Sequence, residues 1–143
     1  MSRVVGVDLG SRRVGLALSD PSGVVATPHT VIERSGDRTT DHRAIVAVAR
    51  EADADRIVVG LPLSLRGDAG PAARAVLEEV EALRAQAEGM TVVTHDERLT
   101  TASAERGLRE AGLGGRDRRA VIDKVAAAVL LQSYLDSPGW RRE

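Results

Sequence analysis

The sequence predicts an α/β sandwich in which helices cover a mixed five-stranded sheet. Three apolar runs of strand length come first, joined by short connections that contain Gly, Ser, Asp or Pro. Such connections favour antiparallel pairing of these three strands. Helical periodicity then alternates with two further short apolar runs, a pattern typical of parallel strands joined by helices.

The first half of the chain provides four strands and one helix. The opening strands are expected at 3–9, 14–19 and 24–32. A helix is expected at 39–52, because Ile45, Val48, Ala49 and Ala52 then share one face. The run RIVVGL at 56–61 is continuously apolar and predicts a strand covered on both faces.

The second half alternates helix and strand and ends in helices. A helix is expected to begin at Pro71 and to end before Gly89, with a strand at 90–94 after it. The buried face of that helix should consist of Ala73, Val76, Val80, Leu83 and Ala87. A short helix at 102–111 and a long one at 118–135 follow, and the long one is apolar nearly all round, which predicts burial. Residues 1–136 should form one domain, and 137–143 a loose tail.

Composition excludes several classes of protein. There is no cysteine, so thiolate catalysis and disulfides are ruled out and a cytoplasmic location is expected. No segment has the length or layout of a membrane span or signal peptide, so no membrane partner is expected. The net charge of −1 argues against a general polyanion-coating protein. Lys124 is the only lysine, however, and clustered arginines can still form a local phosphate-binding face.

Asp8 is the first candidate for chemistry, because it interrupts an apolar strand. A buried carboxylate is costly unless a cation or metal meets it. Capping of the turn at Gly10 and Ser11 is the alternative role. Asp123 poses the same problem inside the last helix, where a bridge to the adjacent Lys124 is geometrically poor. Its alternative role is a favourable interaction with the helix dipole.

A third acidic position follows the strand at 90–94, in the sequence His95, Asp96, Glu97, Arg98. Open α/β sheets place ligand groups at this edge, so one acid could be a metal ligand and the other an auxiliary group. A polar strand end leading into a capped helix is the alternative. His95 alone is more typical of a hydrogen-bonded structural group.

Two loops could contact phosphate. The segment 60–67 could present Ser64 and Arg66, and the segment 112–119 combines glycines with Arg116, Arg118 and Arg119. Solvated loops are the competing interpretation for both. The full set of expected substrate contacts is Ser11, Arg12, Ser64, Arg66, Arg98, Arg116, Arg118 and Arg119.

The three acids make more sense together than singly. A sheet with a helix against it can bring Asp8, Glu97 and Asp123 to one edge, where they would repel one another without a cation. With Mg²⁺ or Mn²⁺ they become oxygen ligands, and two such ions would support hydrolysis of a phosphodiester.

Four ordered motifs give the chain a resemblance to the RuvX/YqgF family, a branch of the ribonuclease H-like superfamily. They are VDLGSRRVGLALSD at 7–20, VVGLPLSLRG at 58–67, HDERLTTASAE at 95–105 and DKVAAAVLLQSYL at 123–135. The resemblance implies a ribonuclease H-like three-layer sandwich. It also implies that Asp8, Glu97 and Asp123 are the catalytic metal ligands, with Asp96 as an auxiliary acid.

For biology the resemblance implies a metal-dependent nuclease that matures the 5′ end of the 16S ribosomal RNA precursor. Resolution of Holliday junctions is the alternative and would need a symmetric dimer, so either a monomer or a homodimer is expected. Two other classes stay open. One is a non-catalytic RNA-binding assembly factor, and the other is an actin-like kinase or ATPase, suggested by the Asp-Leu-Gly-Ser turn at 8–11.

Overall fold

The computed structural model describes residues 2–64, 66–98 and 116–142. The strands are β1 (Arg3–Leu9), β2 (Arg13–Ser19), β3 (Ala26–Glu33), β4 (Ala54–Leu61) and β5 (Thr91–Asp96). The helices are α1 (Arg38–Glu51), α2 (Pro71–Gln86) and α4 (Arg116–Asp136), followed by the single 3₁₀ turn η1 (Trp140–Arg142). The short helix expected at 102–111 lies outside the described residues. None of the helices seen here is long and apolar enough to cross a membrane.

The five strands form one mixed sheet in the order β3-β2-β1-β4-β5. β1 pairs antiparallel with β2, and β2 with β3, whereas β1, β4 and β5 run parallel. The predicted mixed sheet with three antiparallel opening strands is therefore confirmed. The central position of β1 explains its nearly unbroken apolar sequence, because both of its faces are covered.

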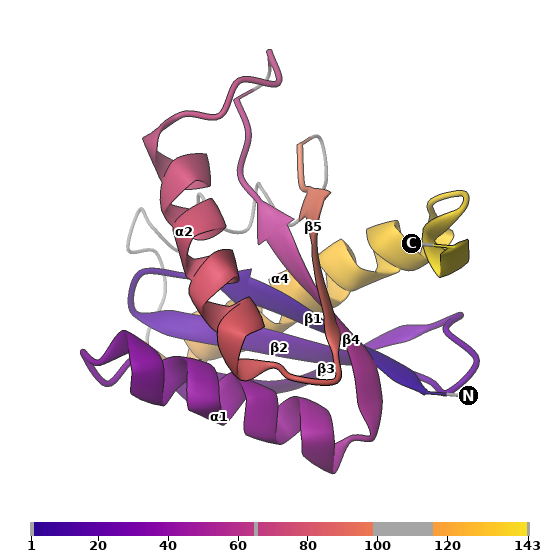
Figure 1. The fold of residues 1–143 in the computed structure, drawn as a ribbon. Coiled ribbons are helices and arrows are strands. Elements are labelled where there is room, and N and C mark those ends of the chain that lie inside the picture. Colours follow the sequence, from indigo (N-terminus) through magenta and orange to yellow (C-terminus); the bar gives the residue numbers. More distant parts are fainter. Residues whose placement is uncertain (1, 65, 99–115, 143) are drawn as a thin grey trace.

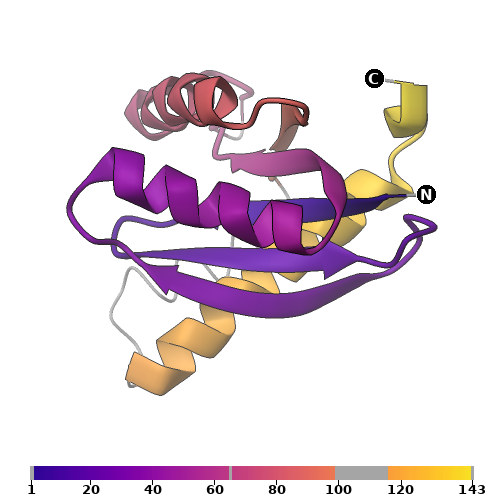
Figure 2. The ribbon, with the colours of Figure 1, turned by 60° about the horizontal axis from the view of Figure 1, so that its bottom comes forward.

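Helices cover both faces of the sheet, with α1 and α2 on one side and α4 on the other (Figures 1 and 2). Side chains alternate between the two cores along each strand. In β1, Val5, Val7 and Leu9 join the core beneath α1 and α2, whereas Val4 packs with Ala127 and Leu131 of α4. The face of α2 is buried as predicted, and the prediction of a largely buried last helix is also confirmed.

The segment after α4 is not the loose tail that was expected. Trp140 is buried, its indole N–H donates to the carbonyl oxygen of Leu135 at 2.8 Å, and the guanidinium of Arg141 stacks over its ring. Arg56, at the start of β4, donates to the Trp140 carbonyl oxygen at 3.0 Å. A tryptophan buries a large apolar area, which is sufficient to hold this short segment on the sheet.

A polar network ties the loop after β1 to the two helices above it. Arg34 donates through both terminal nitrogens to the carboxylate of Glu79 in α2, at 2.6 and 3.0 Å, and through Nε to the carbonyl oxygen of Gly10 at 2.9 Å. His42 of α1 contacts the same carboxylate at 2.8 Å. The network therefore fixes the β1–β2 turn, which directly follows Asp8.

We expect Glu79→Gln to lower the free energy of unfolding by ~2 kcal/mol at neutral pH, because the variant weakens a buried charged hydrogen-bond network. Burial favours a raised pKa for Glu79, but the hydrogen bonds from Arg34 and His42 outweigh it and hold the pKa below its ordinary value. A lowered folded-state pKa contributes stability above the unfolded pKa, and this contribution is lost as the pH falls through the folded pKa.

The difference in free energy of unfolding between Glu79→Gln and wild type should therefore become smaller as the pH falls. Urea unfolding at neutral pH and at successively lower pH measures it, with the exposed Glu81→Gln on the same helix as control. Equal losses from both variants would show that the network adds nothing to stability.

Candidate active site

Asp8 lies near the carboxyl end of the central strand and is 2% exposed. Its sequence neighbours Val7 and Leu9 face the core beneath α1 and α2, so the Asp8 side chain lies on the α4 face. In the antiparallel ladder it stands opposite Gly15 of β2. Side chains of opposed residues share a face, and here one of the two positions has none.

Gly15 leaves room for the backbone of α4. A Cβ atom built on Gly15 would lie 2.1 Å from the carbonyl oxygen of Asp123, so only glycine permits this approach. The strand and helix thereby place Asp123 against the neighbour of Asp8. Asp123 is fully buried.

Gly60 of β4 also leaves room for a neighbouring group, on the other side of Asp8. β1 and β4 are paired at Val7 and Val59, and the next step of that register brings Gly60 beside Asp8. A Cβ atom built on Gly60 would lie 2.7 Å from Oε2 of Glu97, so this carboxylate rests directly on the glycine. Glu97 is 3% exposed and follows β5, with its N–H bonded to the carbonyl oxygen of Leu61.

The structure therefore brings the three predicted acids to one face of the sheet, at the carboxyl ends of β1 and β4. Asp8 lies between two glycines, and Asp123 and Glu97 cover those glycines. The role of the three acids as metal ligands stays a prediction.

Asp123 meets a cation that the sequence did not reveal. Nε of Arg13, at the start of β2, lies 2.6 Å from Oδ2 of Asp123, and the side chain of Arg13 is only 10% exposed. Arg13 and Gly15 are two residues apart in β2 and so lie on the same face. The predicted need for a positive partner inside α4 is thus met from another element.

The donor set matches the chemistry of hard divalent cations. Three buried carboxylates offer oxygen ligands, which Mg²⁺ and Mn²⁺ prefer over nitrogen or sulfur. In the described part of the chain, no three acidic or imidazole side chains are gathered closely enough to hold an ion together. Oδ2 of Asp123 is bonded to Arg13, so this oxygen would have to exchange its partner before it could bind an ion.

The carboxylate of Asp96 is bonded to Arg98. It accepts hydrogen bonds from the backbone N–H and from Nε of Arg98, at 2.9 and 2.7 Å. These bonds hold the pKa of Asp96 below its ordinary value. Arg98 also lies over Gly67, where a Cβ atom would be 2.9 Å from its Nη1, so the pair links the end of β5 to the loop after β4. His95 contacts Ser133 of α4 at 3.0 Å, in keeping with a structural role.

Four of the expected substrate contacts lie in two loops and are exposed. Ser11 and Arg12 are exposed in the β1–β2 turn, and Ser64 and Arg66 are exposed in the loop after β4. The hydroxyl of Ser64 already accepts a hydrogen bond from the N–H of Asp68 at 3.1 Å.

The arginines at the start of α4 differ in their surroundings. Arg118 is exposed, whereas Nε of Arg119 is buried and has no hydrogen-bond partner among the described residues. Arg119 lies one turn before Asp123, on the same side of the helix. Arg116 begins α4, but its side chain lies outside the described part, as does the loop at 99–115.

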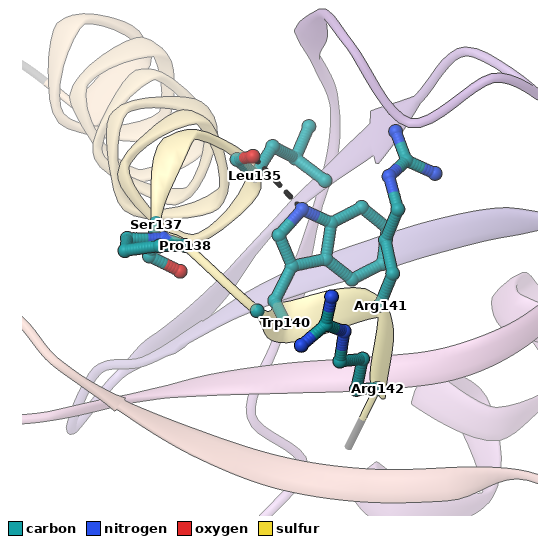
Figure 3. Close-up of a pocket in the computed structure, with 7 residues that line it drawn as sticks. Leu135, Ser137, Pro138, Trp140, Arg141 and Arg142 are labelled. Atoms are coloured by element: carbon teal, nitrogen blue, oxygen red, sulfur yellow. Dashed lines mark hydrogen bonds between the residues drawn. The ribbon is translucent and has the colours of Figure 1, made fainter.

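A pocket of about 590 Å³ lies at the opposite end of α4, around Trp140 (Figure 3). Its lining comes from Leu135, the turn after α4 and the side chains of Arg141 and Arg142. These lining residues contain no acid, so this pocket does not share the chemistry of the Asp8 edge.

Comparisons with known proteins show the family and the fold. Residues 2–137 match the RuvX family model, whose description is Holliday junction resolvase. A Desulforudis audaxviator protein named "Putative pre-16S rRNA nuclease" is 44% identical over 135 residues, covering 94% of each chain. A Mycobacterium protein (strain KMS) of the same name is 46% identical and covers 94% of this chain and 79% of its own length. Thermus thermophilus RuvC bound to a Holliday junction aligns with a TM-score of 0.55 at 16% identity, over 94% of each chain. That likeness confirms the ribonuclease H-like fold.

Proposed function

The chain belongs to the RuvX family of nucleases, and from this we propose that it is a divalent-metal-dependent nuclease that trims the 5′ end of the 16S ribosomal RNA precursor. It is an enzyme that hydrolyses phosphodiester bonds. The observation that carries the proposed metal-dependent chemistry is the placement of three buried carboxylates, from β1, the end of β5 and α4, on one face of the sheet. The names of its relatives favour precursor ribosomal RNA as the substrate, which would place the activity in the cytoplasm.

In this proposal Asp8, Glu97 and Asp123 hold a pair of Mg²⁺ or Mn²⁺ ions. Bound ions would neutralise charge on the phosphate and lower the pKa of an attacking water. Gly15 and Gly60 keep the acids close to the sheet by admitting the backbone of α4 and the carboxylate of Glu97. Asp96 serves as a positioning residue, since it binds Arg98 and so orders the segment next to Glu97.

Arginines at the start of α4 would bind the substrate backbone. A buried guanidinium nitrogen without a partner is costly, and a phosphate oxygen is a suitable acceptor for it. Within the part of the chain that the structure describes, Nε of Arg119 meets this description, and it lies one helical turn from Asp123. Arg118, which is exposed, would extend the same contact surface, and we place Arg116, the first residue of α4, with it.

We expect Arg119→Ala to weaken binding of single-stranded and duplex RNA alike, and to reduce the slope of log K against log salt by about 0.7 to 1. Phosphate contacts release counterions without reading bases, so the loss should not depend on sequence. Fluorescence anisotropy across a salt series measures it, with exposed Arg43→Ala on α1 as the control. An unchanged slope would remove Arg119 from the substrate contacts.

Cleavage tests the proposed function directly. The purified chain is incubated with 16S precursor RNA, a four-way DNA junction and linear duplexes, each with Mg²⁺, Mn²⁺ or chelator. We expect divalent-dependent cleavage of the precursor on the 5′ side of the mature end. Binding of the precursor without cleavage under any metal would instead indicate a non-catalytic assembly factor.

Junction resolution is the second candidate, favoured by the description of the family model. It requires two coordinated cuts, which a symmetric dimer supplies. Paired symmetric nicks in the junction, together with a dimer in sedimentation, would transfer the assignment to DNA.

A further inference from the structure

We propose that Arg13 occupies Asp123 in the metal-free protein and competes with divalent ions for it, so that metal loading exchanges one cation for another. This inference rests on the proposed function, because it concerns the same carboxylate. It assigns to Arg13 a control over metal affinity. Arg13 would accordingly be a positioning residue that acts through Asp123.

The contact itself is close and largely shielded from water. Nε of Arg13 lies 2.6 Å from Oδ2 of Asp123, with the carboxylate fully buried and the guanidinium side chain 10% exposed. Charge-assisted hydrogen bonds of this length are among the strong ones. Screening by solvent is weak at such a site, so a metal ion that takes Oδ2 of Asp123 as its ligand competes with a strongly bound cation.

The pair also accounts for the arrangement of the acids. Asp8 and Glu97 lie over and beside the glycines of the central strands, but the carboxylate of Asp123 is directed toward β2 and Arg13. A guanidinium attached to β2 therefore occupies one carboxylate oxygen of the three-acid set. Exchange of this partner is the step that would let the three carboxylates act together.

A second acid gives Arg13 an alternative partner after exchange. Glu33 of β3 stands directly opposite Arg13 in the β2–β3 ladder, and its side chain is exposed. Cross-strand partners lie on the same face, about 5 Å apart at Cβ. The guanidinium could therefore turn from Asp123 to Glu33, so that metal binding would not leave it buried and unpaired.

The two possible roles of Arg13 predict opposite changes in metal affinity when Arg13 is removed. If Arg13 competes with the ion, its removal tightens metal binding. If Arg13 instead holds Asp123 in its working position, its removal weakens metal binding. The sign of the change in affinity decides between the two.

The experiment titrates Mn²⁺ by calorimetry into metal-free wild type, Arg13→Gln, Arg13→Lys and Asp8→Asn. We expect Arg13→Gln to lower the Kd for Mn²⁺ roughly tenfold or more, the effect of one neighbouring unit charge on a carboxylate equilibrium. Arg13→Lys keeps the charge and should stay close to wild type. Arg43→Gln on α1 makes the same change in net charge far from the site and should have no effect.

Melting curves provide a second readout. In chelator, Arg13→Gln should melt below wild type, because buried Asp123 has lost a partner. Saturating Mn²⁺ should raise the melting temperature of Arg13→Gln by more than that of wild type, because an ion that binds more tightly stabilises the folded state more.

An unchanged or raised Kd in folded Arg13→Gln overturns the competition and makes Arg13 a scaffold for Asp123. If that variant does not fold, the Nε–H resonance of Arg13 in wild type decides, because it should shift as Mg²⁺ is added. A resonance that does not move at saturating Mg²⁺ rejects the exchange. Wild-type Mn²⁺ binding that survives Asp8→Asn contradicts the proposed metal site itself, independently of what Arg13→Gln does.

Discussion

Asp8→Asn is expected to lower divalent-dependent cleavage by roughly a thousandfold, because several kcal/mol of metal-derived stabilisation is lost and each ~1.4 kcal/mol is a factor of ten. Asp8 is the central member of the three acids, between the glycines that Asp123 and Glu97 cover. An amide of the same shape keeps the packing but removes a charged oxygen ligand. The assay is cleavage of the precursor RNA at saturating Mn²⁺.

Two comparisons make this result specific. Asp55→Asn changes an exposed carboxylate at the start of β4 and should cleave like wild type. Circular dichroism should show that both variants are folded. Asp8→Asn that is folded and cleaves at close to the wild-type rate would return Asp8 to the turn-capping role.

The sheet could be predicted because strands that are buried on both faces have continuous apolar sequences. β1 is covered on both faces and is apolar except at Arg3 and Asp8, and β4 is continuously apolar from Ile57 to Leu61. The short connections between β1, β2 and β3 allow only neighbouring antiparallel strands.

The buried face of α1 was harder to predict from the sequence. Ile45 and Ala49 were placed correctly, but the polar Asp41 and His42 are also buried. Asp41 accepts a hydrogen bond from Ser35 just before the helix, and His42 contacts Glu79 of α2.

The acids could be predicted singly, since a charge inside an apolar strand or helix is itself the signal. The partner of Asp123 could not, because Arg13 is 110 residues away and nothing local indicates the contact. The alternation of β2 places Arg13, Gly15 and Ala17 on one face, and glycine within a strand often marks close approach of another backbone. That pattern was the available sign that α4 would lie against Gly15.

Register also explains why Glu97 and Asp96 could not be separated by sequence. Adjacent residues at a strand end point in opposite directions, and the choice depends on which of them continues the α4 face. The structure directs Glu97 onto Gly60 and leaves Asp96 to Arg98. The selection is thus made by the pairing of β4 with β5, which no local pattern encodes.

Gly15→Ala should be the most disruptive glycine-to-alanine change among the described residues. A methyl group at this position would lie 2.1 Å from the carbonyl oxygen and 2.5 Å from the carbonyl carbon of Asp123. Neither atom can yield without moving the backbone of α4. Overpacking of this kind costs ~3 kcal/mol or more when backbone must shift.

The expected result combines stability and function. Gly15→Ala should lower the free energy of unfolding by ~3 kcal/mol, and the fraction that stays folded should bind Mn²⁺ more weakly, because Asp123 moves with the helix. Urea unfolding and calorimetry measure the two effects separately. Gly70→Ala is the matched control, since a Cβ atom there meets nothing within 4 Å. If Gly15→Ala were as stable as this control, α4 would not pack against β2 at Asp123, and the placement of that acid beside Asp8 would be wrong.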